Sequence, residues 1–106
     1  QTCALPICDW HYHLHETYPS VQMFSEAGFE FTACGWQKKD AIRAFHSYAK
    51  KHGGSKYLGY LATNWSPFNR IARYMVEGEV EESTAAETRN FAECIQLGLE
   101  LAWTGA

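Results

Sequence analysis

The sequence contains no apolar run that approaches the roughly 20 residues a helix needs to cross a bilayer. It also lacks an extended basic cluster, because lysines and arginines adjoin only in the doublets Lys38-Lys39 and Lys50-Lys51, and the formal net charge is −3. A strongly basic patch is the usual electrostatic signature of nucleic-acid binding. We therefore expect neither a membrane partner nor a nucleic-acid partner.

Cysteine is scarce, and its spacing matches no redox or metal motif. Cys3, Cys8, Cys34 and Cys94 include no C-x-x-C pair, which excludes a zinc ribbon and a thioredoxin-like redox motif. Cys8 and Cys34 each lie two residues before a tryptophan, at the end of an apolar stretch. We expect both to be small buried hydrophobes, a usage that leaves the cellular compartment undetermined.

Low-complexity and disorder-prone stretches are absent as well, since 46% of the residues are hydrophobic and 20% are charged. With 106 residues the chain accommodates one domain at most. Aromatic residues, in contrast, are abundant at 15%. They concentrate where the predicted strands end, which directs attention to those positions.

A tryptophan motif recurs three times along the chain. An apolar, strand-like stretch runs into a small or polar residue and then tryptophan, with spacings of 26 and 29 residues between Trp10, Trp36 and Trp65. A strand, a loop and a crossover helix together take roughly 30 residues. The three stretches are Ile7-Cys8-Asp9-Trp10, Thr32-Ala33-Cys34-Gly35-Trp36 and Leu61-Ala62-Thr63-Asn64-Trp65.

Between the tryptophans, turn and capping signals divide the chain into alternating strands and helices. Strands are predicted over Leu5–Tyr12, Phe29–Cys34 and Tyr57–Ala62. Helices are predicted from Pro19 to Gly28, from an Asp40 N-cap to Gly53, from an N-cap at Ser66 with Pro67 in the first turn to Val76, and from a Thr84-x-x-Glu87 capping box to Ala102.

This order predicts an α/β fold with a parallel sheet and right-handed crossovers. Three parallel strands alone would leave two long unpaired edges, which closure of the sheet normally removes. We therefore interpret residues 1–106 as the C-terminal part of a single (β/α)8 catalytic domain, a partial TIM barrel of three consecutive βα units and a C-terminal helix. The chain starts at Gln1 and enters a strand almost at once, so we expect the N-terminal βα units of the barrel to precede it.

The densest group of chemically active residues spans Asp9 to Glu16, at the end of the first predicted strand. If the strand continues to His13, then Asp9, His11 and His13 point to one side and Trp10 and Tyr12 to the other. Because ligands bind at the carboxyl ends of parallel strands, we expect the polar set to hydrogen-bond a polar substrate.

The same segment also matches the D-x-H-x-H pattern of metal-dependent hydrolases built on this barrel, in which His11 and His13 would bind one ion. Such a site needs further ligands from later strands. The second and third strand ends instead offer Gly35-Trp36-Gln37 and Thr63-Asn64-Trp65, without histidine or aspartate. We expect no metal and no cofactor.

The tryptophans suggest carbohydrate, because an indole face stacks on the C–H face of a pyranose and its N–H provides a polar contact. Trp36 follows a flexible Gly35, so it is the one expected to pack inward. Trp65 lies between the polar residues Asn64 and Ser66 and is expected to face the ligand. Glycoside hydrolysis needs paired carboxylates, and Asp9 and Glu16 are the only acids near strand ends, so we expect the catalytic pair to lie outside this chain.

Residues 5 to 76 resemble the later βα units of family 20-type glycoside hydrolases. The resemblance rests on the order and spacing of Cys8-Asp9-Trp10-His11-Tyr12, Tyr18-Pro19-Ser20-Val21, Cys34-Gly35-Trp36 and Leu58 to Ser66. It implies a (β/α)8 barrel that hydrolyses β-linked N-acetylhexosamine or related sugars, with the acidic pair on an earlier strand. It also implies that Asp9, Trp10, Tyr12, Trp36 and Trp65 hold the substrate.

Three functions therefore remain open. The first is the substrate-holding part of a glycoside hydrolase, using Asp9, Trp10, His11, Tyr12, His13, Trp36, Asn64 and Trp65. The second is a metal-dependent, amidohydrolase-like barrel that uses His11 and His13. The third is a carbohydrate-binding relative of the barrel that has lost catalysis, and an adjacent Asp-Glu pair at an upstream strand end would distinguish the first from the third.

Overall fold

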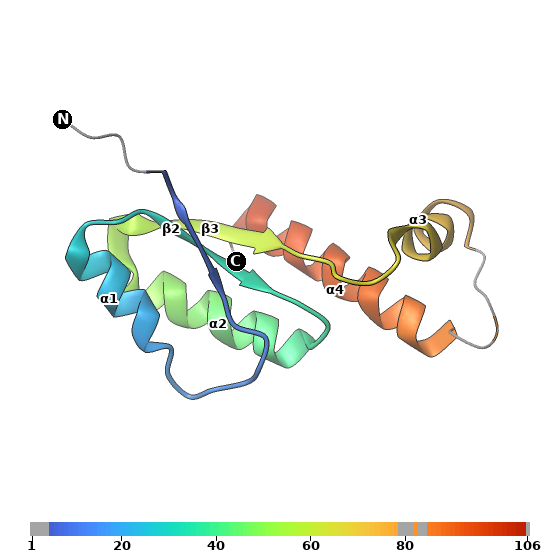
Figure 1. The fold of residues 1–106 in the computed structure, drawn as a ribbon, viewed down its shortest axis with the longest axis horizontal. Helices are drawn as coiled ribbons and strands as arrows, with labels where there is room; N and C mark the ends of the chain where they lie inside the picture. Colours follow the sequence, from blue (N-terminus) through green and yellow to red (C-terminus); the bar gives the residue numbers. More distant parts are fainter. Residues whose placement is uncertain (1–4, 79–81, 83–84, 106) are drawn as a thin grey trace.

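The computed structural model describes residues 5–78, 82 and 85–105, and forms an α/β fold with a three-stranded parallel sheet and four α-helices (Figure 1). In chain order the elements are β1 (Ile7–Trp10), α1 (Pro19–Ala27), β2 (Phe31–Gly35), α2 (Lys39–His52), the 3-10 helix η1 (Gly54–Lys56), β3 (Tyr57–Ala62), α3 (Phe68–Glu77) and α4 (Ala85–Thr104). No helix in these residues is both long and apolar enough to cross a membrane.

The strands lie in the order β1-β2-β3 and both neighbouring pairs are parallel, which confirms the predicted order and direction. The bounds of β3 are as predicted, whereas β1 begins two residues later and ends two residues earlier than Leu5–Tyr12, and β2 begins two residues later and ends one residue later than Phe29–Cys34. Their register aligns the residues in rows across the sheet, such as Trp10, Cys34 and Leu61. All three carboxyl ends therefore lie at one edge of the sheet. The tryptophan spacing predicted this arrangement because each βα unit returns the chain to the same edge.

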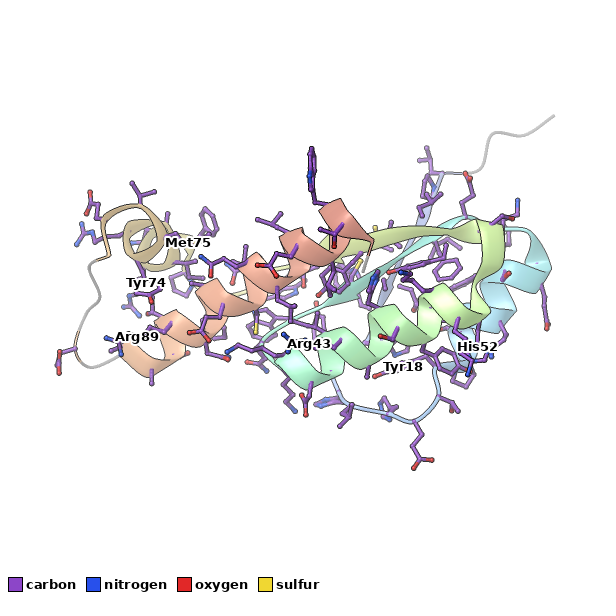
Figure 2. All side chains as sticks on the ribbon, turned by 180° about the vertical axis from the view of Figure 1, so that it is seen from behind. Tyr18, Arg43, His52, Tyr74, Met75 and Arg89 are labelled. Carbon is purple, nitrogen blue, oxygen red and sulfur yellow. The ribbon has the colours of Figure 1, made fainter. Side chains whose placement is uncertain are left out.

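The helices cover one face of the sheet. The strands lie in front of α2 and α4 in Figure 1, and both helices lie in front of the strands in the reverse view of Figure 2. The covered face contributes Phe31, Ala33 and Tyr60 to the main core. The other members of this buried cluster are Tyr18, Val21, Ile42, Phe45, Ala49, Cys94 and Leu97.

The opposite face of the sheet carries no helix in the described part of the chain, and its side chains are correspondingly open. Trp10 is 51% exposed and Leu61 is 45% exposed. Cys8 is exposed, so its predicted burial is wrong, whereas Cys34 lies on the same face but between Trp10 and Leu61 in the central strand, and is buried as predicted. Alternation along β1 directs Cys8 to the uncovered face, which a hydropathy pattern alone cannot reveal.

The helix boundaries agree with the capping signals at some ends and differ at others. Pro19 opens α1, and Gly28 ends it with a φ of 83°, a left-handed conformation that favours glycine. The predicted N-cap at Asp40 is wrong by two positions, because Lys38 precedes α2 and Asp40 lies in its first turn. The predicted N-cap at Ser66 is wrong by one position, because Pro67 precedes α3. Thr84 of the predicted capping box lies outside the described residues.

Close contact between α4 and β3 depends on Gly98. A Cβ atom added there would lie 2.7 Å from Tyr60 Cε2 and 2.9 Å from Ala62 Cβ. We expect Gly98→Ala to lower the free energy of unfolding, because an overpacking cost of about 1–3 kcal/mol outweighs a helix-propensity gain of up to about 1 kcal/mol. Denaturant titration checks this, with Gln96→Ala on the exposed side of α4 as the control. A Gly98→Ala variant as stable as its parent would contradict the packing.

Candidate functional site

The three strand-end tryptophans and Tyr12 meet at the carboxyl edge of the sheet, and we call these four residues the aromatic rim. The ring centroids of Trp10 and Trp65 are 5.3 Å apart at an interplanar angle of 71°. Tyr12 stacks near Trp10 at 6.4 Å and meets Trp36 edge-on at 5.7 Å. The indole Nε1 of Trp65 donates a hydrogen bond of 2.6 Å to the Tyr12 hydroxyl. Residues from the ends of all three strands thus form one continuous aromatic surface.

The rim has an exposed part and a packed part. Trp10 is half exposed and Trp65 is 61% exposed, so both offer ring surface to a ligand. Trp36 is half-buried and stacks on Phe91 of α4 at 5.6 Å and 10°. Trp36 thus packs inward, as expected, and Tyr12 of the rim packs against its ring.

A tight turn after β2 fixes Trp36. Gln37 has a φ of 55°, the only described residue other than glycine in the left-handed region, and the Lys38 amide donates to the Trp36 carbonyl at 2.8 Å. The side-chain amide of Asn90 on α4 donates to the Gln37 carbonyl at 2.8 Å. A strained backbone of this kind persists only where surrounding contacts hold it, and here α4 supplies them.

Asp9 lies on the helix-covered side of the sheet and is only 8% exposed. Ser20 Oγ, at the start of α1, donates to Asp9 Oδ2 at 2.6 Å. His11 Nε2 lies 3.1 Å from Asp9 Oδ1 and 2.9 Å from Ser20 Oγ. The His11 ring also packs edge-on against Tyr18 and Phe45. Asp9 and His11 thus point away from Trp10 and Tyr12, as strand alternation predicts, but towards the protein interior.

The Asp9–Ser20–His11 network is arranged to hold structure and differs from a Ser-His-Asp catalytic triad. In a triad the histidine uses one ring nitrogen for the serine and the other for the aspartate. Here Nε2 faces both partners. Because the single Ser20 hydroxyl proton goes to Asp9, Ser20 Oγ can only accept from Nε2–H, and His11 cannot act as its base. The network connects the end of β1 to α1 and so helps to fix the positions of the neighbouring residues Trp10 and Tyr12.

His13 makes contacts different from those of His11. Its Nδ1 lies 3.2 Å from Lys38 Nζ in an exposed position, and its carbonyl accepts from the Tyr18 hydroxyl at 3.1 Å. Among the described residues, no three or more histidine, cysteine, aspartate or glutamate side chains are placed to hold a metal ion. A zinc site ordinarily has at least three protein ligands, so these residues alone do not supply the set that the D-x-H-x-H pattern would require.

Asn64 shapes the loop that presents Trp65. Its Oδ1 accepts from Ser66 N at 3.3 Å and from Ser66 Oγ at 2.5 Å, and its Nδ2 donates to the Ser66 carbonyl at 2.9 Å. Thr63 Oγ1 donates to the Gly35 carbonyl at 2.7 Å and joins the ends of β3 and β2. An Asx turn of this kind fixes the direction of the residue that it encloses. Asn64 therefore supports the aromatic rim by holding the loop that carries Trp65.

Cys34 lies below the rim, in the row between Trp10 and Leu61. Its Sγ lies 3.6 Å from Thr32 Oγ1. Burial raises the pKa of the Cys34 thiol to about 11. At neutral pH this thiol stays protonated, so Cys34 contributes a small apolar floor and no nucleophile.

Sequence reasoning missed three supporting residues: Ser20, Thr63 and Asn90. Ser20 follows a helix-opening proline, and a hydroxyl in the first turn can face the preceding strand, which was the available signal. No comparable signal marks Asn90, because its partner is a backbone carbonyl 53 residues earlier. Comparisons with models of known protein families, with curated proteins and with solved structures found no match.

Proposed function

We propose that this chain is the substrate-holding part of a (β/α)8 glycoside hydrolase of the family 20 type, which acts on β-linked N-acetylhexosamine-type sugars. The observation that carries the proposal is the aromatic rim at the carboxyl ends of three adjacent parallel strands. In (β/α)8 enzymes this end of the strands holds the substrate.

The one-sided sheet supports the barrel. Helices α2 and α4 pack on one face, while Trp10, Leu61 and Cys8 on the other face are open. A barrel surrounds its sheet with helices on the outside and fills the inside with strand side chains. The outer edges of β1 and β3 are unpaired within the described residues, and pairing with further strands would complete them.

The geometry of the rim supports a sugar ligand. Trp10 and Trp65 pack edge to face at an angle of 71°, and both rings keep exposed surface beside each other. Ring faces match the C–H faces of a pyranose, and the Tyr12 hydroxyl beside them supplies a polar contact. An aromatic surface of this kind orients a sugar without carrying out chemistry on it.

Bond cleavage falls to residues outside this chain. Asp9 already accepts a hydrogen bond from Ser20 and lies 3.1 Å from His11 Nε2, and Glu16 lies exposed in the loop that follows β1. Neither carboxylate faces the rim together with a second one, as both inverting and retaining mechanisms require. In this proposal the earlier βα units provide the general acid and its partner.

Turnover by the intact protein tests the function. We expect hydrolysis of an aryl N-acetyl-β-hexosaminide, and competitive inhibition by free N-acetylglucosamine. Inhibitor binding without turnover would favour the non-catalytic carbohydrate-binding relative. Absence of both binding and turnover would contradict the proposal.

Cysteine labelling tests the barrel separately. In a closed barrel the face that carries Cys8 is interior, so we expect iodoacetamide at pH 8 to modify Cys8 of the intact protein at least tenfold more slowly than after urea unfolding. Buried Cys34, with its pKa of about 11, is the internal control and stays unmodified in the folded protein. Peptide mass spectrometry gives both rates. Rapid Cys8 labelling beside a protected Cys34 would contradict closure over this face.

A further inference from the structure

A cavity of about 190 Å³ lies at the end of the sheet opposite the aromatic rim. It opens between the last turns of α2, the start of β3 and the last turns of α4. Because β3 has six residues, the cavity and the rim are separated by about 20 Å. Its lining residues are His46, Lys50, Tyr57, Leu58, Gly59, Leu101, Ala102 and Gly105.

A bulge in β3 forms one wall of the cavity. Phe31 pairs with Tyr57 and Thr32 pairs with Gly59, so Leu58 is an extra residue in the ladder. Gly59 has a φ of 135°, in the region that side chains rarely adopt. A bulge redirects side chains, and bulges are over-represented next to binding sites. Here the bulged pair, Leu58 and Gly59, faces the cavity.

A buried polar pair forms the second wall. His46 is 2% exposed, and its Nδ1 lies 2.6 Å from the Tyr57 hydroxyl. Burial raises the pKa of Tyr57 above its usual range, so the hydroxyl keeps its proton at neutral pH. With the His46 proton on Nδ1, the ring donates to the Tyr57 oxygen and the hydroxyl proton is left for a ligand. Lys50 adds a cation at the mouth, where its ammonium also donates to the Gly105 carbonyl.

The residues that line the cavity include the cation Lys50 and no carboxylate. Lys51 and Lys56 lie nearby at this end of α2 and η1, and Glu30 before β2 and Glu100 in α4 lie at the same end of the sheet. Lys50 and Lys51, in the last turn of α2, also stabilise this helix through their interaction with the negative end of its dipole. A polar wall, an apolar wall and a lining cation without a lining carboxylate together suit a small amphipathic anion.

We propose that this cavity is a second ligand site, which binds a small organic carboxylate. The carboxylate contacts the Lys50 ammonium and the Tyr57 hydroxyl, and the apolar body lies against Leu58 and Leu101. The volume is similar to the about 150 Å³ of an engineered apolar cavity that binds benzene, which suits a body the size of one aromatic ring. This site is independent of the sugar site in both residues and location.

Fluorine NMR of the intact protein with para-fluorobenzoate tests the site. We expect saturable binding, and at least fivefold weaker binding of the neutral analogue para-fluorobenzyl alcohol. Lys50→Gln should weaken para-fluorobenzoate binding at least fivefold. Lys51→Gln is the matched control, because it removes the same charge one residue away and does not line the cavity. Tyr57→Phe keeps the ring and should also weaken binding.

Several results would overturn the site. Equal weakening by Lys50→Gln and Lys51→Gln would show general charge attraction, and equal binding of the alcohol would exclude recognition of the carboxylate. Loss of binding in Trp65→Ala would place the probe at the aromatic rim instead. Absence of saturable binding would dismiss the proposal outright. Sugar hydrolysis is unaffected by any of these outcomes, so failure here is distinct from failure of the proposed function.

Discussion

Replacing Trp65 with alanine is expected to lower kcat/KM of the intact protein on an aryl N-acetyl-β-hexosaminide by roughly 5- to 150-fold. This corresponds to the loss of about 1–3 kcal/mol of transition-state binding, the range for removing a well-buried apolar contact. The ring is 61% exposed without ligand, so most of its surface is available to a sugar. Its removal also leaves the Tyr12 hydroxyl without the indole donor. The melting temperature should change little.

A second tryptophan provides the matched control. Trp103 is 91% exposed in the last turn of α4, away from the aromatic rim and next in sequence to Ala102, which lines the cavity at the other end of the sheet. We expect Trp103→Ala to leave kcat/KM unchanged. Unchanged kinetics in Trp65→Ala, together with a large drop in its melting temperature, would show that Trp65 packs in the protein and does not bind sugar.

Replacing Asp9 with alanine is expected to destabilise the protein by about 2–3 kcal/mol. The carboxylate accepts a hydrogen bond from Ser20 and faces His11 in a buried position. Its loss leaves the Ser20 hydroxyl without its acceptor and removes the carboxylate beside the His11 ring, and an unsatisfied buried group costs about 1–3 kcal/mol. Denaturant unfolding measures the change.

Two comparisons separate a structural role for Asp9 from direct substrate contact. Glu16→Ala removes the same charge from an exposed position in the following loop and should leave stability within about 0.5 kcal/mol. Asp9→Asn keeps an acceptor for Ser20 and should recover part of the stability. If Asp9→Ala instead lowers kcat/KM without lowering stability, Asp9 contacts substrate, as the sequence first suggested.

The strand order and the meeting of the tryptophans at one edge were predictable from sequence. The spacing of Trp10, Trp36 and Trp65 matches the length of a βα unit, and parallel units align their strand ends. Local rules were sufficient here because the repeat, the turn glycines and the helix-opening Pro19 all indicate the same topology.

The orientation of the polar residues was not predictable to the same degree. Alternation correctly separates Asp9 and His11 from Trp10 and Tyr12, but it does not specify which face the helices cover. That depends on tertiary packing, in which Tyr18 and Phe45 surround the His11 ring. The same missing information explains the exposed Cys8.

Short-range competition accounts for the errors at the helix starts. Ser66 has the side chain of a good N-cap, yet it is held by Asn64 in an Asx turn, and α3 begins after Pro67. Asp40 has a similar capping side chain, but α2 begins two residues earlier than an N-cap at Asp40 would place it, and Asp40 Oδ1 accepts from the Ala41 amide. Residue preferences identify where a helix begins only to within a residue or two.

The crystal structure of the intact protein with bound N-acetylglucosamine tests the central claim most directly. We expect the sugar ring to lie with its C–H face on Trp65 and its edge towards Trp10, and we expect β1 and β3 to pair with further strands of a closed barrel. Sugar bound away from the aromatic rim would contradict the proposed site. A sheet that stays open beside β1 and β3 would contradict the barrel.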